Sequence, residues 1–198
     1  MSLIPDFELG LWNAWIFILL VFIIPHLFLN KYWKARGWDE EARRYSEKEK
    51  TLGNILTVVF VASVIYGIFL PLKLWTAWFY VGMSIYLLGM IFLIMATLNF
   101  AATPLDKPVT KGAYHLSRHP LSFSGFLTFI GMGIACVSWI FLLLAILFVI
   151  LMNTLVIPEE HWCLEKYGNA YREYMNRTPK WIGIPKSRKE TDTSSRIL

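Results

Sequence analysis

Two short polar segments of this sequence carry the residues that could bind a ligand or take part in a reaction. The first segment, residues 107–120, reads KPVTKGAYHLSRHP and precedes an apolar stretch. Pro120 favours the first turn of a helix, and Gly112 permits a tight turn with close approach of the backbone to a ligand. A simpler interpretation is a basic loop that caps the next helix. The polar and aromatic side chains of the segment include Lys111, Tyr114, His115, Arg118 and His119.

The second segment, residues 158–185, follows the last apolar stretch and contains two adjacent carboxylates, Glu159 and Glu160. If the helix continues into this segment, Glu160 shares a face with Cys163 and Tyr167, at spacings of three and four residues. The carboxylate would then point to the same side as an aromatic ring. As a purely structural feature, the segment would be an amphipathic tail on the membrane surface.

A glycine and an aromatic stripe follow in the same segment. Gly168 is expected to end the helix, because glycine commonly occupies the position just after a helix C-terminus. The short helix after it would have one apolar face, made of Tyr171, Tyr174 and Met175. Trp181 has the character of an interfacial anchor that folds the tail back against a bilayer.

The composition of the chain is that of a membrane protein. Of the 198 residues, 56% are hydrophobic and 17% are charged, and a soluble domain of this length could not bury so much apolar surface. The apolar residues fall in five blocks, each near the roughly 20 residues that a helix needs to cross a bilayer. We therefore predict an all-α polytopic protein, a single membrane domain over residues 1–198 with about five transmembrane helices. The blocks cover about 11–29, 52–71, 74–100, 121–137 and 138–157.

The basic residues predict the orientation of the chain. All of the 19 lysines and arginines except Lys73 lie in the connections 30–51 and 101–120 or after Pro158. Because such residues stay on the cytoplasmic side, the N-terminus should lie outside and the C-terminus in the cytoplasm. The net charge of +5 is thereby explained by topology, and no nucleic-acid partner is expected.

The last two apolar blocks should form a tight helical hairpin, because only Ser138 and Trp139 separate them. Such a hairpin brings the two polar segments to the same membrane face. The basic pair at 118–119 should then lie beside the carboxylates at 159–160, where opposite charges orient each other and a polar ligand.

Taken together, the two segments resemble one protein superfamily. The pattern is R-H-P at 118–120, a helical hairpin, then E-E, L-x-x-Y-G-x-x-Y-x-x-Y and T-P-x-W. It is similar to the C-terminal region of the isoprenylcysteine carboxyl methyltransferase and phospholipid methyltransferase superfamily. The resemblance covers residues 107–185, whereas the first three predicted spans match only in number and hydrophobicity.

This resemblance implies an S-adenosylmethionine-dependent methyltransferase with its cofactor pocket in residues 107–185, at the cytoplasmic membrane face. Arg118 and Glu160 would be the catalytic residues, no metal site is implied, and residues 186–198 would form a flexible tail. The acceptor would be an isoprenylcysteine-like carboxylate, a phospholipid amine or a small hydrophobic molecule. The implied cofactor-binding residues are Lys111, Gly112, Tyr114, His119, Pro120, Glu159 and Glu160.

Methyl transfer from a sulfonium requires mainly that donor and acceptor are held in line. A carboxylate acceptor needs only a cation such as Arg118, whereas an amine or thiol must also lose a proton, to Glu160 or His119. Because the loops are too short to enclose a large soluble substrate, we expect a lipophilic acceptor to enter sideways from the bilayer. Membrane lipids would therefore surround the acceptor, and the membrane would supply it.

Two other functions stay open, and one departure from the family pattern supports the second of them. Members commonly read R-H-P-x-Y-x-G, but this chain has Ser122 at the tyrosine position and Ser124 at the glycine position. Membrane-bound sterol reductases share a similar C-terminal pattern and use NADPH, although they are larger. A non-catalytic membrane scaffold with the same fold would also be compatible with the two serines.

Overall fold

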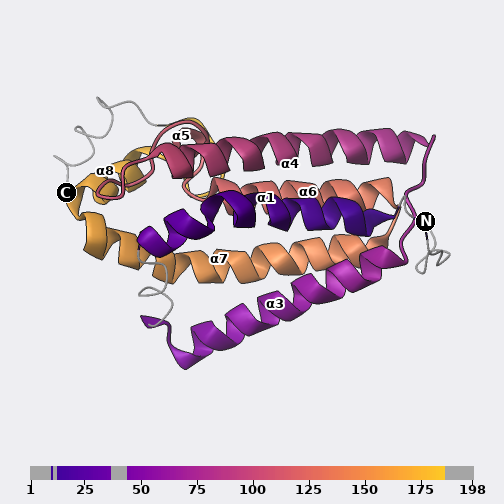
Figure 1. The fold of residues 1–198 in the computed structure, drawn as a ribbon, viewed down its shortest axis with the longest axis horizontal. Coiled ribbons are helices and arrows are strands. Elements are labelled where there is room, and N and C mark those ends of the chain that lie inside the picture. Colours follow the sequence, from indigo (N-terminus) through magenta and orange to yellow (C-terminus); the bar gives the residue numbers. More distant parts are fainter. Residues whose placement is uncertain (1–9, 11–12, 37–43, 186–198) are drawn as a thin grey trace.

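The computed structural model describes residues 10, 13–36 and 44–185, and the tail expected over 186–198 lies outside them. In the described part, five long helices run side by side and two short helices lie together at one end (Figure 1). The all-α membrane architecture predicted from the sequence is confirmed. The long helices are α1 (Ala14–Ala35), α3 (Glu47–Ile68), α4 (Ala77–Ala102), α6 (Pro120–Ala135) and α7 (Trp139–Tyr167), and the short ones are α5 (Ala113–Leu116) and α8 (Asn169–Arg177).

Length and composition divide the long helices into two groups. Helices α3, α4 and α7 are long and apolar enough to cross a membrane. The apolar part of α1 ends at Leu29, and α6 has only 16 residues, so both are shorter than a full span. In the described part of the chain, each of the five predicted blocks thus corresponds to one helix, and three of these helices satisfy the length and composition of a membrane span.

Two helices extend well beyond their apolar blocks, because polar residues with good helix propensity continue them. Helix α3 begins at Glu47 behind a capping box, in which Ser46 and Glu49 satisfy each other's backbone N–H groups. Helix α7 passes through Pro158 and ends at Tyr167, where Gly168 adopts a positive φ of 55°. The helix does continue past the proline, and the predicted glycine stop is confirmed.

Helices α4 and α6 pack so closely that their backbones touch. A Cβ atom on Gly82 would lie 2.3 Å from the backbone nitrogen of Ala135, and one on Gly131 would lie 2.5 Å from that of Tyr86. Such close approach is expected where small residues lie at membrane helix interfaces. This contact, the α4–α6 seam, fixes the position of α6, whose first residue is Pro120.

The turn between α6 and α7 is short, as predicted, but it consists of Cys136, Val137 and Ser138, and Trp139 is the first residue of α7. Ser138 is the N-cap of α7, and its hydroxyl accepts a hydrogen bond from the N–H of Phe141 at 3.3 Å. Val137, just before it, has a positive φ of 54°. Since the hairpin is tight, the start of α6 and the far end of α7 lie at the same end of the bundle as α5 and α8 (Figure 1).

Candidate functional site

A cavity of about 750 Å³ lies among the helices and extends to the end of the bundle that carries α5 and α8. Side chains of α1 and α3 form an apolar wall, which includes Ile23, Leu27 and Phe60. The opposite end is charged and aromatic, with residues from both polar segments of the sequence. The charged residues that line this end are Arg36, Arg118, His119 and Glu159, and the aromatic ones are Phe100, Tyr114, Trp162, Tyr167, Tyr171 and Tyr174.

His119 lies between the two adjacent carboxylates of α7. Its Nε2 is 2.9 Å from Oε1 of Glu160, and its Nδ1 is 3.4 Å from Oε2 of Glu159. Arg118 also reaches Glu160, with 3.4 Å between Nη1 and Oε1. The predicted proximity of the basic pair to the carboxylate pair is therefore confirmed.

The charge on His119 follows from this geometry. Burial alone would lower the pKa of the imidazole, but the charges and hydrogen bonds of Glu159 and Glu160 outweigh it and raise the pKa to about 9. The ring is 97% buried, so solvent screens these interactions little. His119 is consequently a cation at neutral pH and has no free lone pair to accept a proton.

The C-terminal segment folds back onto the R-H-P motif and holds it in place. The N–H of Arg118 donates to the carbonyl of Pro179 at 3.0 Å, and the N–H of Gly183 donates to the carbonyl of Leu116 at 3.1 Å. The indole of Trp181 lies 6.3 Å from the imidazole of His119, measured between ring centroids. Trp181 thus lies beside His119, and its role as an anchor at the membrane interface stays a prediction.

Three buried tyrosines give the charged end of the cavity an aromatic wall. Tyr174 donates its hydroxyl hydrogen to the carbonyl of Tyr114 at 2.7 Å, which ties α8 to α5. Burial raises the pKa of Tyr114, Tyr171 and Tyr174 far above its ordinary value. These hydroxyls stay neutral, so the rings present electron-rich faces that attract cations.

The structure brings most, but not all, of the predicted site residues to the cavity. Tyr114, Arg118, His119, Pro120 and Glu159 line it, whereas Lys111, Gly112 and Glu160 do not. Whether any of these residues binds a cofactor or takes part in catalysis stays a prediction.

The three residues away from the cavity have other surroundings. Lys111 is exposed. Gly112 has a φ of 62° and no room for a side chain, since a Cβ atom would lie 2.0 Å from Oδ1 of Asn99. Glu160 is not part of the cavity lining and pairs instead with Arg118 and His119. For Gly112, the close contact with Asn99 of α4 is a sufficient reason for a glycine at that position.

The two serines that depart from the family pattern have different surroundings. Ser122 lines the cavity, so it leaves space that a tyrosine side chain at this position would fill. Ser124 is fully buried, and its hydroxyl donates to the carbonyl of Leu121 at 2.7 Å. A serine is thus accommodated at the glycine position without an unsatisfied polar group.

Sequence reasoning missed one charged residue of the cavity. Arg36 was expected only as a basic residue of a cytoplasmic connection, yet it is 5% exposed and lines the cavity. Its neighbours come from α4, α7 and the loop after α4, so no local spacing signals its position. Within the described ranges, no cluster of three histidine, cysteine or acidic side chains could hold a metal ion.

A family comparison agrees with this arrangement. The family model described as phospholipid methyltransferase matches residues 58–170, which is more than half of the chain and includes both R-H-P and E-E. No curated protein and no solved structure gives a significant match. The chain therefore belongs to the phospholipid methyltransferase family and is a membrane methyltransferase that acts on lipid-like substrates.

Proposed function

We propose that this protein transfers a methyl group from S-adenosylmethionine to a lipophilic acceptor at the cytoplasmic membrane face. One observation carries the proposal: a single cavity joins an apolar wall to a charged and aromatic end built from both sequence motifs. Its volume of about 750 Å³ lies within the range of ordinary ligand sites.

The residues at the charged end fit the chemistry of this cofactor. S-adenosylmethionine supplies an electrophilic methyl group on a sulfonium, and its amino-acid end carries an ammonium and a carboxylate. Glu159 would attract the positive groups, as would the ring faces of Tyr171 and Tyr174. Arg118 would attract the carboxylate, and its buried Nε–H has no acceptor within the described part of the chain.

The geometry favours Glu159 over Glu160 as the group that accepts a proton from an amine acceptor. Glu159 lines the cavity, whereas Glu160 does not and is occupied by Arg118 and His119. When the nitrogen–carbon bond forms and the carbon–sulfur bond breaks, the amine proton would pass to Glu159. Glu160 would act as a positioning residue that orients Arg118 and His119.

The acceptor would reach the cavity from the bilayer between α1 and α3. Ile23 and Leu27 line the cavity and are 45% and 73% exposed on the apolar surface of α1. A hydrocarbon chain can therefore lie along this wall while its head group reaches the charged end. In this proposal the charged end of the cavity faces the cytoplasm. The N-terminus of the chain would then lie outside and the C-terminus in the cytoplasm.

Calorimetry on the purified protein in detergent tests the cofactor proposal. S-adenosylmethionine and its demethylated product should bind with a micromolar Kd, about −8 kcal/mol, and NADPH should not bind measurably. Glu159→Gln should weaken binding about 10-fold, as expected for a lost charge-assisted contact. Binding of NADPH without binding of S-adenosylmethionine would contradict the proposal and favour a reductase.

A further inference from the structure

The C-terminal segment after α8 supports the main chain of the R-H-P motif. It lies at the end of the bundle that carries α5 and α8 (Figure 1). The carbonyl of Pro179 accepts a hydrogen bond from the N–H of Arg118 at 3.0 Å. The carbonyl of Lys180 accepts one from the buried hydroxyl of Ser117 at 3.3 Å, and that hydroxyl accepts from the N–H of His119 at 3.1 Å. The segment therefore holds the backbone N–H of both basic residues, directly for Arg118 and through Ser117 for His119.

The side chain of Lys180 reaches the helix that carries the E-E pair. Its ammonium donates to Oδ1 of Asn153 at 3.1 Å and to the backbone carbonyl of the same residue at 3.3 Å. The ammonium also lies 5.9 Å from the ring centroid of Trp181. Asn153 precedes Glu160 by seven residues on α7, which is close to two full helical turns. Lys180 is therefore joined to the face of α7 that carries Glu160.

The charge of Lys180 acts on the carboxylate of Glu160, although the C-terminal segment lies outside the cavity. Burial alone would raise the pKa of Glu160, but the basic residues of the R-H-P motif lower it. The ammonium of Lys180 adds to this lowering of the pKa. Arg118 and His119 line the cavity, whereas none of the described residues 178–185 does. Any effect of the segment on a ligand must therefore pass through the side chains that it positions.

Asn153 is a polar residue in an apolar part of α7. It belongs to the apolar block 138–157, and its side chain is exposed on the helix surface. An amide that faces lipid is unfavourable unless it finds a partner, and the long side chain of a lysine can reach such a site from the membrane interface. The need of this amide for a partner accounts for the side chain of Lys180. It does not account for the carbonyl of the same residue, which holds Ser117. Lys180 thus connects the R-H-P motif to the E-E helix.

We infer that Lys180 is a positioning residue: its contact with Asn153 sets the alignment of the R-H-P motif with the E-E pair of α7. The inference rests on the proposed function, because Arg118 and Glu159 are the residues proposed to bind the cofactor. Without the contact, the C-terminal segment and α7 can shift relative to each other. The basic residues of the motif then lose their alignment with the carboxylates, and the charged end of the cavity binds its ligand less tightly.

The first test measures the alignment without any ligand. Burial lowers the pKa of His119, but the charges and hydrogen bonds of Glu159 and Glu160 raise it to about 9. The Tm of the wild type should therefore fall between pH 7 and 9.5, as the protonated form is lost. Asn153→Leu breaks the contact with Lys180 and leaves every charge in place. In this variant the fall should shrink to less than about half, because a displaced imidazole gains less from the carboxylates. A merely structural contact would shift the Tm equally at every pH.

The second test measures ligand binding by calorimetry with S-adenosylhomocysteine in detergent. Asn153→Leu and Lys180→Met should each weaken the Kd about 3- to 10-fold, the size expected for one lost hydrogen bond. The double variant should bind no more weakly than Lys180→Met alone, because both changes remove the same contact. Lys180→Arg can donate to the same two oxygens and should stay within about 2-fold of the wild-type Kd.

Two control variants remove polar groups near the contact but not from it. Thr154→Val changes the next residue of α7, whose hydroxyl donates to the carbonyl of Ile150 in the same helix at 3.3 Å. Arg172→Gln removes an exposed charge from α8. Both controls should keep the wild-type Kd and the wild-type fall of the Tm.

The outcomes separate this inference from the proposed function. If the wild type binds S-adenosylhomocysteine and Asn153→Leu keeps either the wild-type Kd or the wild-type fall of the Tm, the inference is overturned. Equal effects of Asn153→Leu and Thr154→Val would also overturn it, because α7 would then respond to the loss of any polar group there. A wild type that does not bind S-adenosylhomocysteine would refute the proposed function, and the Tm curves would still decide the role of Lys180.

Discussion

The two sides of the helix bundle are built in opposite ways. Along the α4–α6 seam, glycines bring two backbones into contact, and Phe129, Met132 and Ala135 of α6 are buried. On the side of α1, α3 and α7, the helices enclose a cavity and expose large apolar side chains such as Leu27. The seam holds Pro120 and the motif before it in a fixed place, while the other side leaves room for ligands. The α4–α6 contact thus provides rigidity, and the side of the bundle formed by α1 and α3 provides access to the cavity.

The largest effect should come from the charged cluster at the end of the cavity. Glu160→Gln should lower methyl transfer by about 30- to 1000-fold, or roughly 2 to 4 kcal/mol, because Arg118 and His119 lose the carboxylate that orients them. Arg118→Gln should have a loss of similar size. Rates with a confirmed acceptor, measured at saturating cofactor, provide the test.

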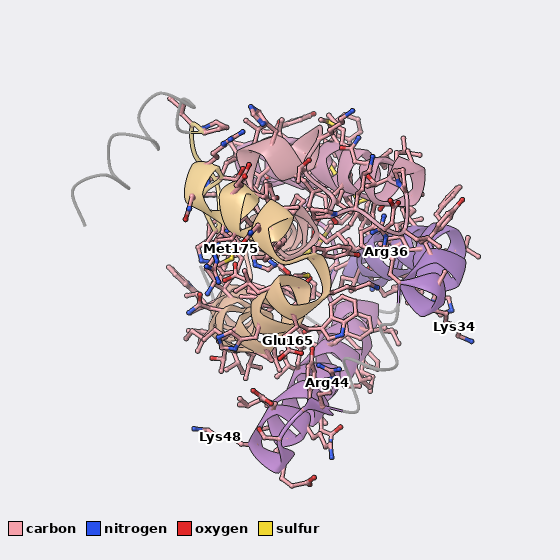
Figure 2. All side chains as sticks on the ribbon, turned by 90° about the vertical axis from the view of Figure 1, so that its left-hand side faces the viewer. Lys34, Arg36, Arg44, Lys48, Glu165 and Met175 are labelled. Atoms are coloured by element: carbon pink, nitrogen blue, oxygen red, sulfur yellow. The ribbon has the colours of Figure 1, made fainter. Side chains whose placement is uncertain are left out.

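Glu165→Gln is the matched control, five residues further along α7. Glu165 pairs with Arg44 on the surface (Figure 2), and both side chains are more than half exposed. Exposed ion pairs contribute about 0 to 1 kcal/mol, so this variant should be nearly silent. Equal losses for Glu160→Gln and Glu165→Gln would contradict the assignment of the site.

The next effect in size is a pH dependence of stability that the charged cluster imposes. His119 has a pKa of about 9 in the folded protein, against an ordinary value of 6.5. Its protonated form therefore stabilises the fold fully below pH 6.5, and the contribution is lost as the pH rises through 9. The loss should be at most about 3 kcal/mol. The Tm of the wild type should fall between pH 7 and 9.5, and His119→Gln should flatten this fall. Parallel Tm curves for both proteins would show that another group is responsible.

The seam should respond to a single methyl group, whereas the open side should not. Gly131→Ala places a Cβ atom 2.5 Å from the backbone of α4 and should destabilise the protein by about 1 to 3 kcal/mol. Gly53→Ala on α3 meets nothing within 4 Å and should leave the Tm unchanged or slightly higher. If both variants melt at the wild-type temperature, the tight seam is not a feature of the folded protein.

Hydropathy and spacing predicted much of this architecture, because they act locally. The five apolar blocks, the glycine stop at 168 and the hairpin that joins R-H-P to E-E all follow from short-range rules. Helix ends were less predictable, since hydropathy marks where lipid contact ends and not where the helix ends. Helix α7, for example, continues ten residues beyond its apolar block.

The parts of the site that sequence reasoning could not predict depend on tertiary contacts. Glu159 and Glu160 are adjacent on a helix, so their side chains point about 100° apart. Only Glu159 lines the cavity. The spacing of the two residues does not predict which of them does. Arg36 lies beside carbonyl groups more than 60 residues away in the sequence. Its burial follows from how the end of α1 meets α4, the loop after α4 and Tyr167, which a motif does not encode.

The most direct test of the account is whether the cofactor occupies this cavity. Cys163 lines the cavity, whereas Cys136 is fully buried elsewhere, so iodoacetamide should label Cys163 in a Cys136→Ala background. With S-adenosylhomocysteine at about ten times its Kd, labelling should slow about 10-fold, because only the ligand-free fraction reacts. An unchanged labelling rate, at a concentration that calorimetry shows to be saturating, would mean that the cofactor binds outside the cavity and would contradict the account.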